Sequence, residues 1–152
     1  NVSSEKKVKY AQEAGADEVI NYKTENISER IKVITDGIGV NRIIELDIAT
    51  NGPTYSKVLA KHGTVILYGT SKVMANFEAA DFFFKWASLK GFIVYTISDA
   101  QRKEGVIALN KMLMDNSLET IIARTFTLDN IVDAHEMVGL ANHIGNVVID
   151  LH

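Results

Sequence analysis

Four consecutive residues, Tyr68-Gly69-Thr70-Ser71, are the clearest candidates for ligand binding in the sequence. They follow an apolar run typical of a buried strand, so they would open the loop at its carboxyl end. Gly69 would let the backbone approach a ligand closely, and the hydroxyls of Thr70 and Ser71 could donate hydrogen bonds to it. The same tetrapeptide also suits an ordinary turn after a strand. The residues alone leave both interpretations open.

Two adjacent lysines, Lys6 and Lys7, stand at the start of the first predicted helix. The first backbone N–H groups of a helix lack intrahelical partners, and the helix dipole favours negative charge beside them. An ammonium group there acts in the same sense, which suits a phosphate. Lysines at such positions are also common as solvated surface charges. Both interpretations stay open on the pattern alone.

Several catalytic and metal-binding patterns are missing from the sequence. It contains no cysteine, and its four histidines show no recognised ligand spacing. It has neither the G-x-S-x-G elbow of serine hydrolases nor the G-x-G-x-x-G turn of dinucleotide-binding folds. We therefore assign no catalytic residue and no metal ligand from the sequence.

Composition indicates an ordinary globular domain. The 152 residues are 47% apolar and carry a formal charge of −3, with basic residues scattered among acids. This balance argues against a nucleic-acid partner. No apolar run approaches the roughly 20 residues of a membrane-spanning helix, and the first residues resemble neither a signal nor a transit peptide. We expect no membrane partner and a cytoplasmic location.

Strands and helices are predicted to alternate along the chain, from short branched apolar runs and from apolar residues at helical spacing. The predicted strands are 19–22, 40–46, 64–68, 92–97, 121–126 and 146–151. The predicted helices are 4–15, 26–37, one from a turn at 50–53 to 62–63, 79–89, one opened by a capping box of Ser98 and Gln101, and 129–142. Crossovers of helical length require parallel strands covered on both faces. The sequence therefore predicts an α/β fold, a doubly wound parallel sheet followed by a short strand-helix-strand tail.

Three segments, taken in order, resemble the medium-chain dehydrogenase/reductase superfamily. They are Ser3-Ser4-Glu5-Lys6-Lys7, the run from Ala14 to Tyr22, and Leu67 to Ser71. They look most like its zinc-independent NADPH:quinone oxidoreductase branch, which includes zeta-crystallin. The resemblance covers essentially the whole chain. It implies a partial Rossmann sheet in residues 1–120, lacking the first strand and the Gly-rich turn, and a tail in residues 121–152 that resembles the returning part of the catalytic domain.

The resemblance also implies a cofactor site and a reaction. In the superfamily, residues matching Ser4, Lys7 and Tyr22 surround the adenosine 2′-phosphate of NADPH. Residues matching Ile48 and Ala49 border the nicotinamide, together with the loop from Tyr68 to Ser71. The implied reaction transfers hydride from NADPH to a small quinone or enone, with little side-chain acid–base chemistry. This chain would form the cofactor-binding portion of such an enzyme and would be inactive alone.

Two alternatives to this branch stay open. The chain could be the carboxyl-terminal part of a zinc-dependent alcohol dehydrogenase of the same superfamily. It could also be a non-catalytic crystallin-like or RNA-associating protein. In the superfamily's strand order, the missing strands would leave bare sheet edges beside 19–22 and 40–46. Bare edges invite pairing, so we expect a homo-oligomer.

Overall fold

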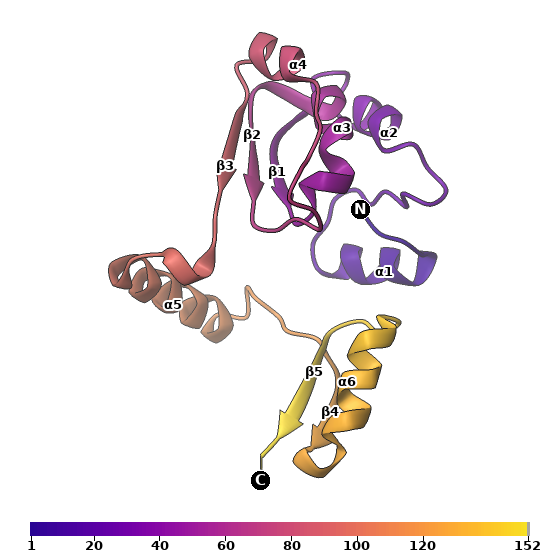
Figure 1. The fold of residues 1–152 in the computed structure, drawn as a ribbon. Helices are drawn as coiled ribbons and strands as arrows, with labels where there is room; N and C mark the ends of the chain where they lie inside the picture. The colour runs from indigo at the N-terminus through magenta and orange to yellow at the C-terminus, as the bar shows by residue number, and fades with distance from the viewer. Residues whose placement is uncertain (152) are drawn as a thin grey trace. The chain divides into compact units, whose positions relative to one another are not determined.

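The computed structural model describes residues 1–151, which form two compact units (Figure 1). The first unit runs from Asn1 to Ile97, and the second begins at Ser98. The boundary between residues 97 and 98 separates two parts of the chain that each pack mainly within themselves. The predicted boundary at 120/121 concerns the two domains of a larger enzyme and stays a prediction.

The first unit is built on a parallel sheet of three strands, which confirms the predicted α/β class. These strands are β1 (Val40–Glu45), β2 (Leu59–Leu67) and β3 (Ser88–Gly91), paired in the order β1-β2-β3. Helices α3 (Ile48–Val58) and α4 (Ala79–Phe84) lie in the connections between successive strands. Figure 1 shows the three strands side by side with α3 beside them. All three strands therefore end at the same edge of the sheet.

The core of this unit lies between α3 and the sheet. Its buried cluster consists of Ile48, Tyr55, Leu59 and Val65. Two of these side chains come from α3 and two from β2. Branched apolar residues suit a buried parallel strand, which explains why this part of the sheet could be predicted from the sequence.

The amino-terminal segment contains α1 (Glu5–Glu13) and α2 (Ile27–Ile34). Asn26 caps α2, because its side chain accepts a hydrogen bond from Glu29 N at 3.1 Å. The predicted strand at 19–22 is wrong: these residues form only an isolated parallel bridge, between Val2 and Asn21. The single residue Val2 offers too short a partner for a full ladder to form.

The predicted turn at 50–53 is also wrong, since α3 begins at Ile48 and carries Pro53 inside it. Gly52, which suggested a turn, is buried in the helix. A Cβ atom there would lie only 2.9 Å from the Asn76 carbonyl oxygen, so this glycine permits close packing. The helix ends at Val58, earlier than predicted, because Leu59 pairs with Val40 and starts β2.

The third strand of this sheet begins earlier in the chain than predicted. Helix α4 ends at Phe84, and Trp86 has a left-handed backbone with φ of 51°, so β3 begins at Ser88. The predicted strand at 92–97 instead contains a short 3-10 helix, Val94–Thr96. Its strongly β-forming composition does not produce a strand, because composition supplies no pairing partner.

The entry to β1 is sterically confined. Gly39 has a φ of 89°, and a Cβ atom there would lie 2.5 Å from the carbonyl oxygen of Val58. Only glycine fits this contact without a shift of the backbone. The start of β1 is therefore held against the end of α3.

The second unit contains α5 (Asp99–Met114), β4 (Ile122–Thr127), α6 (Ile131–Leu140) and β5 (Asn146–Asp150). The capping box of Ser98 and Gln101 is confirmed in both directions. Strands β4 and β5 pair in parallel with α6 between them in sequence, which confirms the predicted strand-helix-strand tail. A short 3-10 turn, Leu128–Asn130, precedes α6.

Replacing Leu59 with alanine should destabilise the first unit strongly. Its side chain is only 2% exposed, and leucine-to-alanine changes in cores lower the free energy of unfolding by about 2–5 kcal/mol. Val33→Ala, at an exposed position of α2, is the matched control and should change it by less than about 0.5 kcal/mol. Chemical denaturation of both variants tests this, and equal losses would contradict the assignment of the core.

Candidate functional site

The loops that follow β1 and β2 meet at the carboxyl edge of the sheet. Tyr68 N donates to the Glu45 carbonyl oxygen at 3.0 Å, just beyond the paired ends of the strands. A Cβ atom on Gly69 would lie 2.6 Å from the Leu46 carbonyl oxygen, so only glycine lets the loops approach this closely. The two loops thus form one surface.

A hollow of about 380 Å³ opens at the carboxyl ends of β2 and β3. Three of the predicted site residues line it: Tyr68, Gly69 and Thr70. The other lining residues are Leu67, Gly91, Phe92, Ile93 and Thr96. The hollow is therefore largely apolar, and the Tyr68 side chain, half exposed, forms part of its wall.

The hydroxyls of Thr70 and Ser71 already donate within the protein. Thr70 Oγ1 donates to the Lys72 carbonyl oxygen at 2.8 Å, and Ser71 Oγ donates to Asp47 Oδ1 at 2.8 Å. A hydroxyl has one proton, so in this conformation both can only accept a hydrogen bond from a ligand. Ser71 does not line the hollow with the other three residues.

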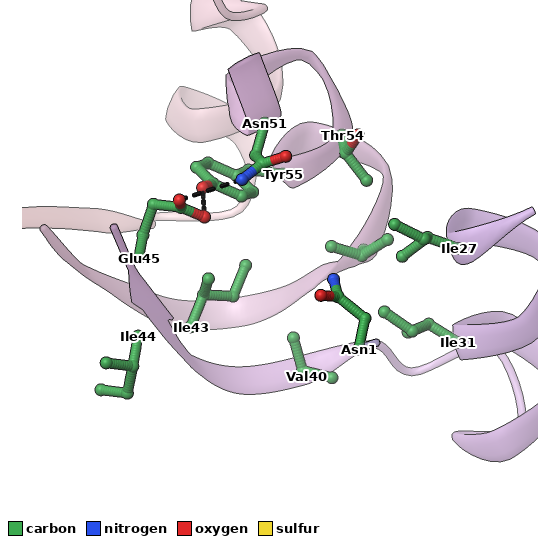
Figure 2. Close-up of a pocket in the computed structure, with 11 residues that line it drawn as sticks. Asn1, Ile27, Ile31, Val40, Ile43, Ile44, Glu45, Asn51, Thr54 and Tyr55 are labelled. Atoms are coloured by element: carbon green, nitrogen blue, oxygen red, sulfur yellow. Dashed lines mark hydrogen bonds between the residues drawn. The ribbon is translucent and has the colours of Figure 1, made fainter. Parts of the chain in front are cut away.

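A buried carboxylate organises the end of β1. Glu45 is 7% exposed, and its Oε1 accepts hydrogen bonds from Asp47 N and from Asn51 Nδ2, the latter at 3.0 Å. Its Oε2 accepts a hydrogen bond from the Tyr55 hydroxyl. Figure 2 shows the Glu45 carboxylate directed toward Asn51 and Tyr55 of α3. These bonds satisfy both oxygens of a buried acidic side chain and join the end of β1 to α3.

Asp47 links the two loops and was missed by sequence reasoning. Its Oδ1 accepts hydrogen bonds from Ser71 N at 2.9 Å and Ser71 Oγ at 2.8 Å. Hydrogen bonds from the Thr50 side chain, then from Ser71, lower the pKa of Asp47 from 3.8 to about 2. Hydrogen bonding favours the charged form of a carboxylate, which accounts for the direction. The two acids at 45 and 47, at the end of a strand and just beyond it, were the only signal in the sequence.

The structure places Ile48 and Ala49 in the first turn of α3. The Ile48 side chain is 5% exposed and belongs to the core cluster, so only its backbone could border a ligand. Ala49 is half-buried. Neither residue lines the hollow with Tyr68.

Ser4, Lys7 and Tyr22 come from two segments that the bridge at Val2 joins. Val2 N donates to the Ile20 carbonyl oxygen at 2.9 Å, and Tyr22 N donates to the Val2 carbonyl oxygen at 3.1 Å. Ser4 stands at the N-cap of α1 and its side chain makes no capping hydrogen bond. Lys7 is half-buried in the first turn of that helix.

A side-chain contact ties the same two segments together. Asn21 Nδ2 donates to Glu5 Oε1 at 3.1 Å. Tyr22, about half exposed, lines a separate surface hollow of about 350 Å³ that includes Lys57. The start of α1 therefore adjoins the segment that carries Tyr22.

Metal-binding clusters and membrane-spanning helices do not occur in the described part of the chain. Residues 1–151 contain no group of three or more His, Asp or Glu side chains placed to hold a metal ion. No helix among these residues is both long and apolar enough to cross a membrane.

The fold and the hollow together define the class of the first unit. It is an open parallel α/β sheet, and in such sheets ligands bind beyond the carboxyl ends of the strands. The sequence model of the family described as "Zinc-binding dehydrogenase" matches residues 2–111. This chain belongs to that family of oxidoreductases.

Known proteins resemble the chain over nearly its whole length. It is 30% identical to a quinone oxidoreductase-like protein 2 homolog of Nematostella vectensis, covering 97% of this chain and 42% of the relative. A quinone oxidoreductase structure from Pseudomonas syringae matches with a TM-score of 0.83 at 21% identity, covering 99% and 47% of the two chains. The benzyl alcohol dehydrogenase structure from Acinetobacter calcoaceticus matches with a TM-score of 0.84 at 21% identity, covering 98% and 41%. The chain thus spans less than half of the length of these relatives, and the structural matches establish the fold.

The Asp47 carboxyl group should titrate near pH 2. Because its folded-state pKa lies below 3.8, its hydrogen bonds favour the folded state above about pH 3.8, and this contribution disappears as the pH falls through about 2. The pH dependence of the Asp47 carboxyl carbon shift in NMR measures the midpoint. Ser71→Ala removes one hydrogen bond and should raise it. A midpoint of 3.8 or higher in the unsubstituted protein would contradict the Ser71 contact.

Proposed function

We propose that this chain is the cofactor-binding portion of an NADPH-dependent oxidoreductase that reduces small quinones or enones. The observation that carries the proposal is the hollow at the carboxyl ends of β2 and β3, lined by Tyr68, Gly69 and Thr70. Open α/β sheets bind nucleotides at this edge. The family match and the quinone oxidoreductase relatives support the same assignment.

The residues present fit a nicotinamide group at this hollow. Its walls offer apolar surface from Leu67, Phe92 and Ile93, together with the half-buried Gly69. When bound, the reduced nicotinamide supplies hydride to the substrate. The contribution of this chain is then to hold the ring in place and exclude water, and we assign no side chain to proton transfer.

The predicted 2′-phosphate residues Ser4, Lys7 and Tyr22 support NADPH over NADH as the cofactor. The Val2 bridge brings the start of α1, with Ser4 and Lys7, beside the segment carrying Tyr22. The Ser4 hydroxyl is not used as a cap, so it can donate to a phosphate. The Lys7 ammonium would add a charge-assisted hydrogen bond to the 2′-phosphate.

We also propose which domains of the full enzyme these residues belong to and where the enzyme is located. Residues 1–120 would be the NADP-binding Rossmann part, and residues 121–152 would belong to the catalytic domain. A larger enzyme would complete the substrate pocket, so we expect no turnover from these residues alone. The location proposed is the cytoplasm.

A zinc-dependent alcohol dehydrogenase is the second candidate, since the chain also has the fold of benzyl alcohol dehydrogenase. Metal analysis and substrate assays of the full-length protein separate the two candidates. Zinc bound stoichiometrically, with alcohol oxidation and no quinone reduction, would favour the dehydrogenase.

Replacing Lys7 with alanine should weaken NADPH binding about tenfold and leave NADH binding nearly unchanged, because only NADPH carries the 2′-phosphate. Lys9→Ala, in the same helix, is the matched control; Lys9 lies 3.7 Å from Glu13 at an exposed position. Fluorescence titration with both nucleotides measures the effect. Equal weakening of both nucleotides, or equal effects of the two substitutions, would refute the 2′-phosphate role of Lys7.

The exposed edge of β1 supports the proposed homo-oligomer. Within residues 1–151, β1 is an edge strand of its sheet, and Ile44 on it is largely exposed. Beside it lies a hollow of about 220 Å³ (Figure 2), bordered by apolar side chains that include Ile27, Ile31 and Val40. In a protein of residues 1–152 alone, an unpaired edge beside apolar surface favours strand addition from another copy.

In a protein of residues 1–152 alone, replacing Ile44 with lysine should shift the distribution toward the monomer, because a charge on an edge strand opposes pairing. Light scattering over a concentration series measures the distribution. Val33→Lys, at an exposed apolar position on α2, is the matched control and should leave association unchanged. A monomeric unsubstituted protein would contradict the proposed association.

A further inference from the structure

Asp47 occupies the junction between two loops of the candidate site. It follows β1 by two residues and stands at the N-cap of α3. Its carboxylate reaches across the carboxyl edge of the sheet to Ser71, 24 residues later in the chain, and accepts both the backbone N–H and the hydroxyl of that residue. Both donors converge on the single atom Oδ1.

The backbone of Asp47 is itself fixed from the interior of the unit. Its N–H donates to the buried Glu45 carboxylate, which also accepts hydrogen bonds from Asn51 and Tyr55 of α3. The Asp47 backbone is therefore fixed by the buried Glu45 side chain. Ser71 in turn is fixed by its two hydrogen bonds to the Asp47 carboxylate. The buried Glu45 network rigidifies the residues that it joins, whereas the Asp47–Ser71 hydrogen bonds lie at the surface.

The loop that Asp47 holds contributes three residues to the wall of the hollow. Ser71 directly follows Tyr68, Gly69 and Thr70, which line it. The opposite end of this segment is fixed by the hydrogen bond from Tyr68 N to Glu45 O. Asp47 supplies the second fixed point, so the loop is anchored at both ends to β1 and the residues that follow it.

We propose that Asp47 is a positioning residue for the cofactor: by holding Ser71, it keeps Tyr68, Gly69 and Thr70 in the conformation that receives the nicotinamide end. This inference rests on the proposed function of the hollow. Asp47 does not line the hollow, so in this proposal it acts through the loop.

The direction in which nucleotide affinity changes when the Asp47 carboxylate is removed distinguishes a positioning role from simple electrostatic repulsion. A carboxylate near an anionic nucleotide repels it, so its removal would strengthen binding if charge alone mattered. Positioning predicts the opposite, because a loop released from Ser71 must be ordered again when the cofactor binds. The two explanations therefore predict changes in opposite directions.

The experiment measures NADPH affinity by fluorescence titration in the full-length protein. Asp47→Ala should weaken binding about tenfold, as expected for the loss of hydrogen bonds to a charged group. Asp47→Asn keeps an oxygen at the same place and should restore binding to within about threefold of the unsubstituted protein. Ser71→Ala should weaken it less than Asp47→Ala, and adding Ser71→Ala to Asp47→Ala should weaken it little further.

Asp115 offers a matched control in the second unit. Its Oδ1 also accepts the backbone N–H and the hydroxyl of a serine, Ser117, at 3.0 and 2.5 Å. Asp115→Ala removes the same kind of contact at a residue that does not line the hollow, and it should leave NADPH affinity unchanged. Hydrogen exchange adds a second readout, since Asp47→Ala should expose the Ser71 amide and Asp47→Asn should not.

Each outcome decides between the positioning role and its alternatives. If the unsubstituted protein binds NADPH but Asp47→Ala binds it equally or more tightly, the positioning role is wrong and the proposed function stands. Loss of binding with no rescue by Asp47→Asn also overturns it. If Asp47→Ala does not fold, Ser71→Ala decides, and unchanged affinity in that variant overturns the role. If the unsubstituted protein binds no nicotinamide nucleotide, the proposed function fails and this inference with it.

Discussion

The parallel pairing of β1 with β2 is the constraint on which the candidate site depends. Because the two strands run in the same direction, with Glu45 opposite Leu67, their following loops leave the sheet at one edge. Asp47 and Ser71 are thereby brought within hydrogen-bonding distance although they lie 24 positions apart. Antiparallel pairing of the same strands would send the two loops to opposite edges.

Much of the fold could be predicted where local signals agreed with tertiary packing. The branched apolar run at 40–46 became β1, and the capping box of Ser98 and Gln101 opens α5. Predictions failed where a residue's role depended on a distant neighbour. Gly52 suggested a turn, but a glycine is needed there because the Asn76 carbonyl group leaves no room for a side chain. Residues 92–97 have the composition of a strand, but the residues that pair with β2 are Ser88–Gly91.

The candidate site shows the same division. The sequence indicated the Tyr68–Ser71 loop, because glycine and hydroxyl residues after an apolar run form a local pattern. It did not indicate that both hydroxyls donate internally, nor that Asp47 receives one of them, because that contact spans 24 residues. A single carboxylate after a strand forms no repeating pattern by which the sequence could identify it. Only the folded arrangement shows which of the chain's 19 acidic residues takes part.

Two glycines, one at each end of the β1–β2 pair, restrict sterically which register the two strands can adopt. Gly39 abuts the Val58 carbonyl oxygen before the strands begin, and Gly69 abuts that of Leu46 after they end. A slip of β1 by one residue would press the side chain of a neighbour such as Ile38 or Val40 into a space that accommodates only hydrogen. Misaligned pairings are thus penalised twice, by sterics as well as by reversal of the buried and exposed faces. The alignment that assembles the ligand-binding edge is then also the one that the backbone itself can tolerate.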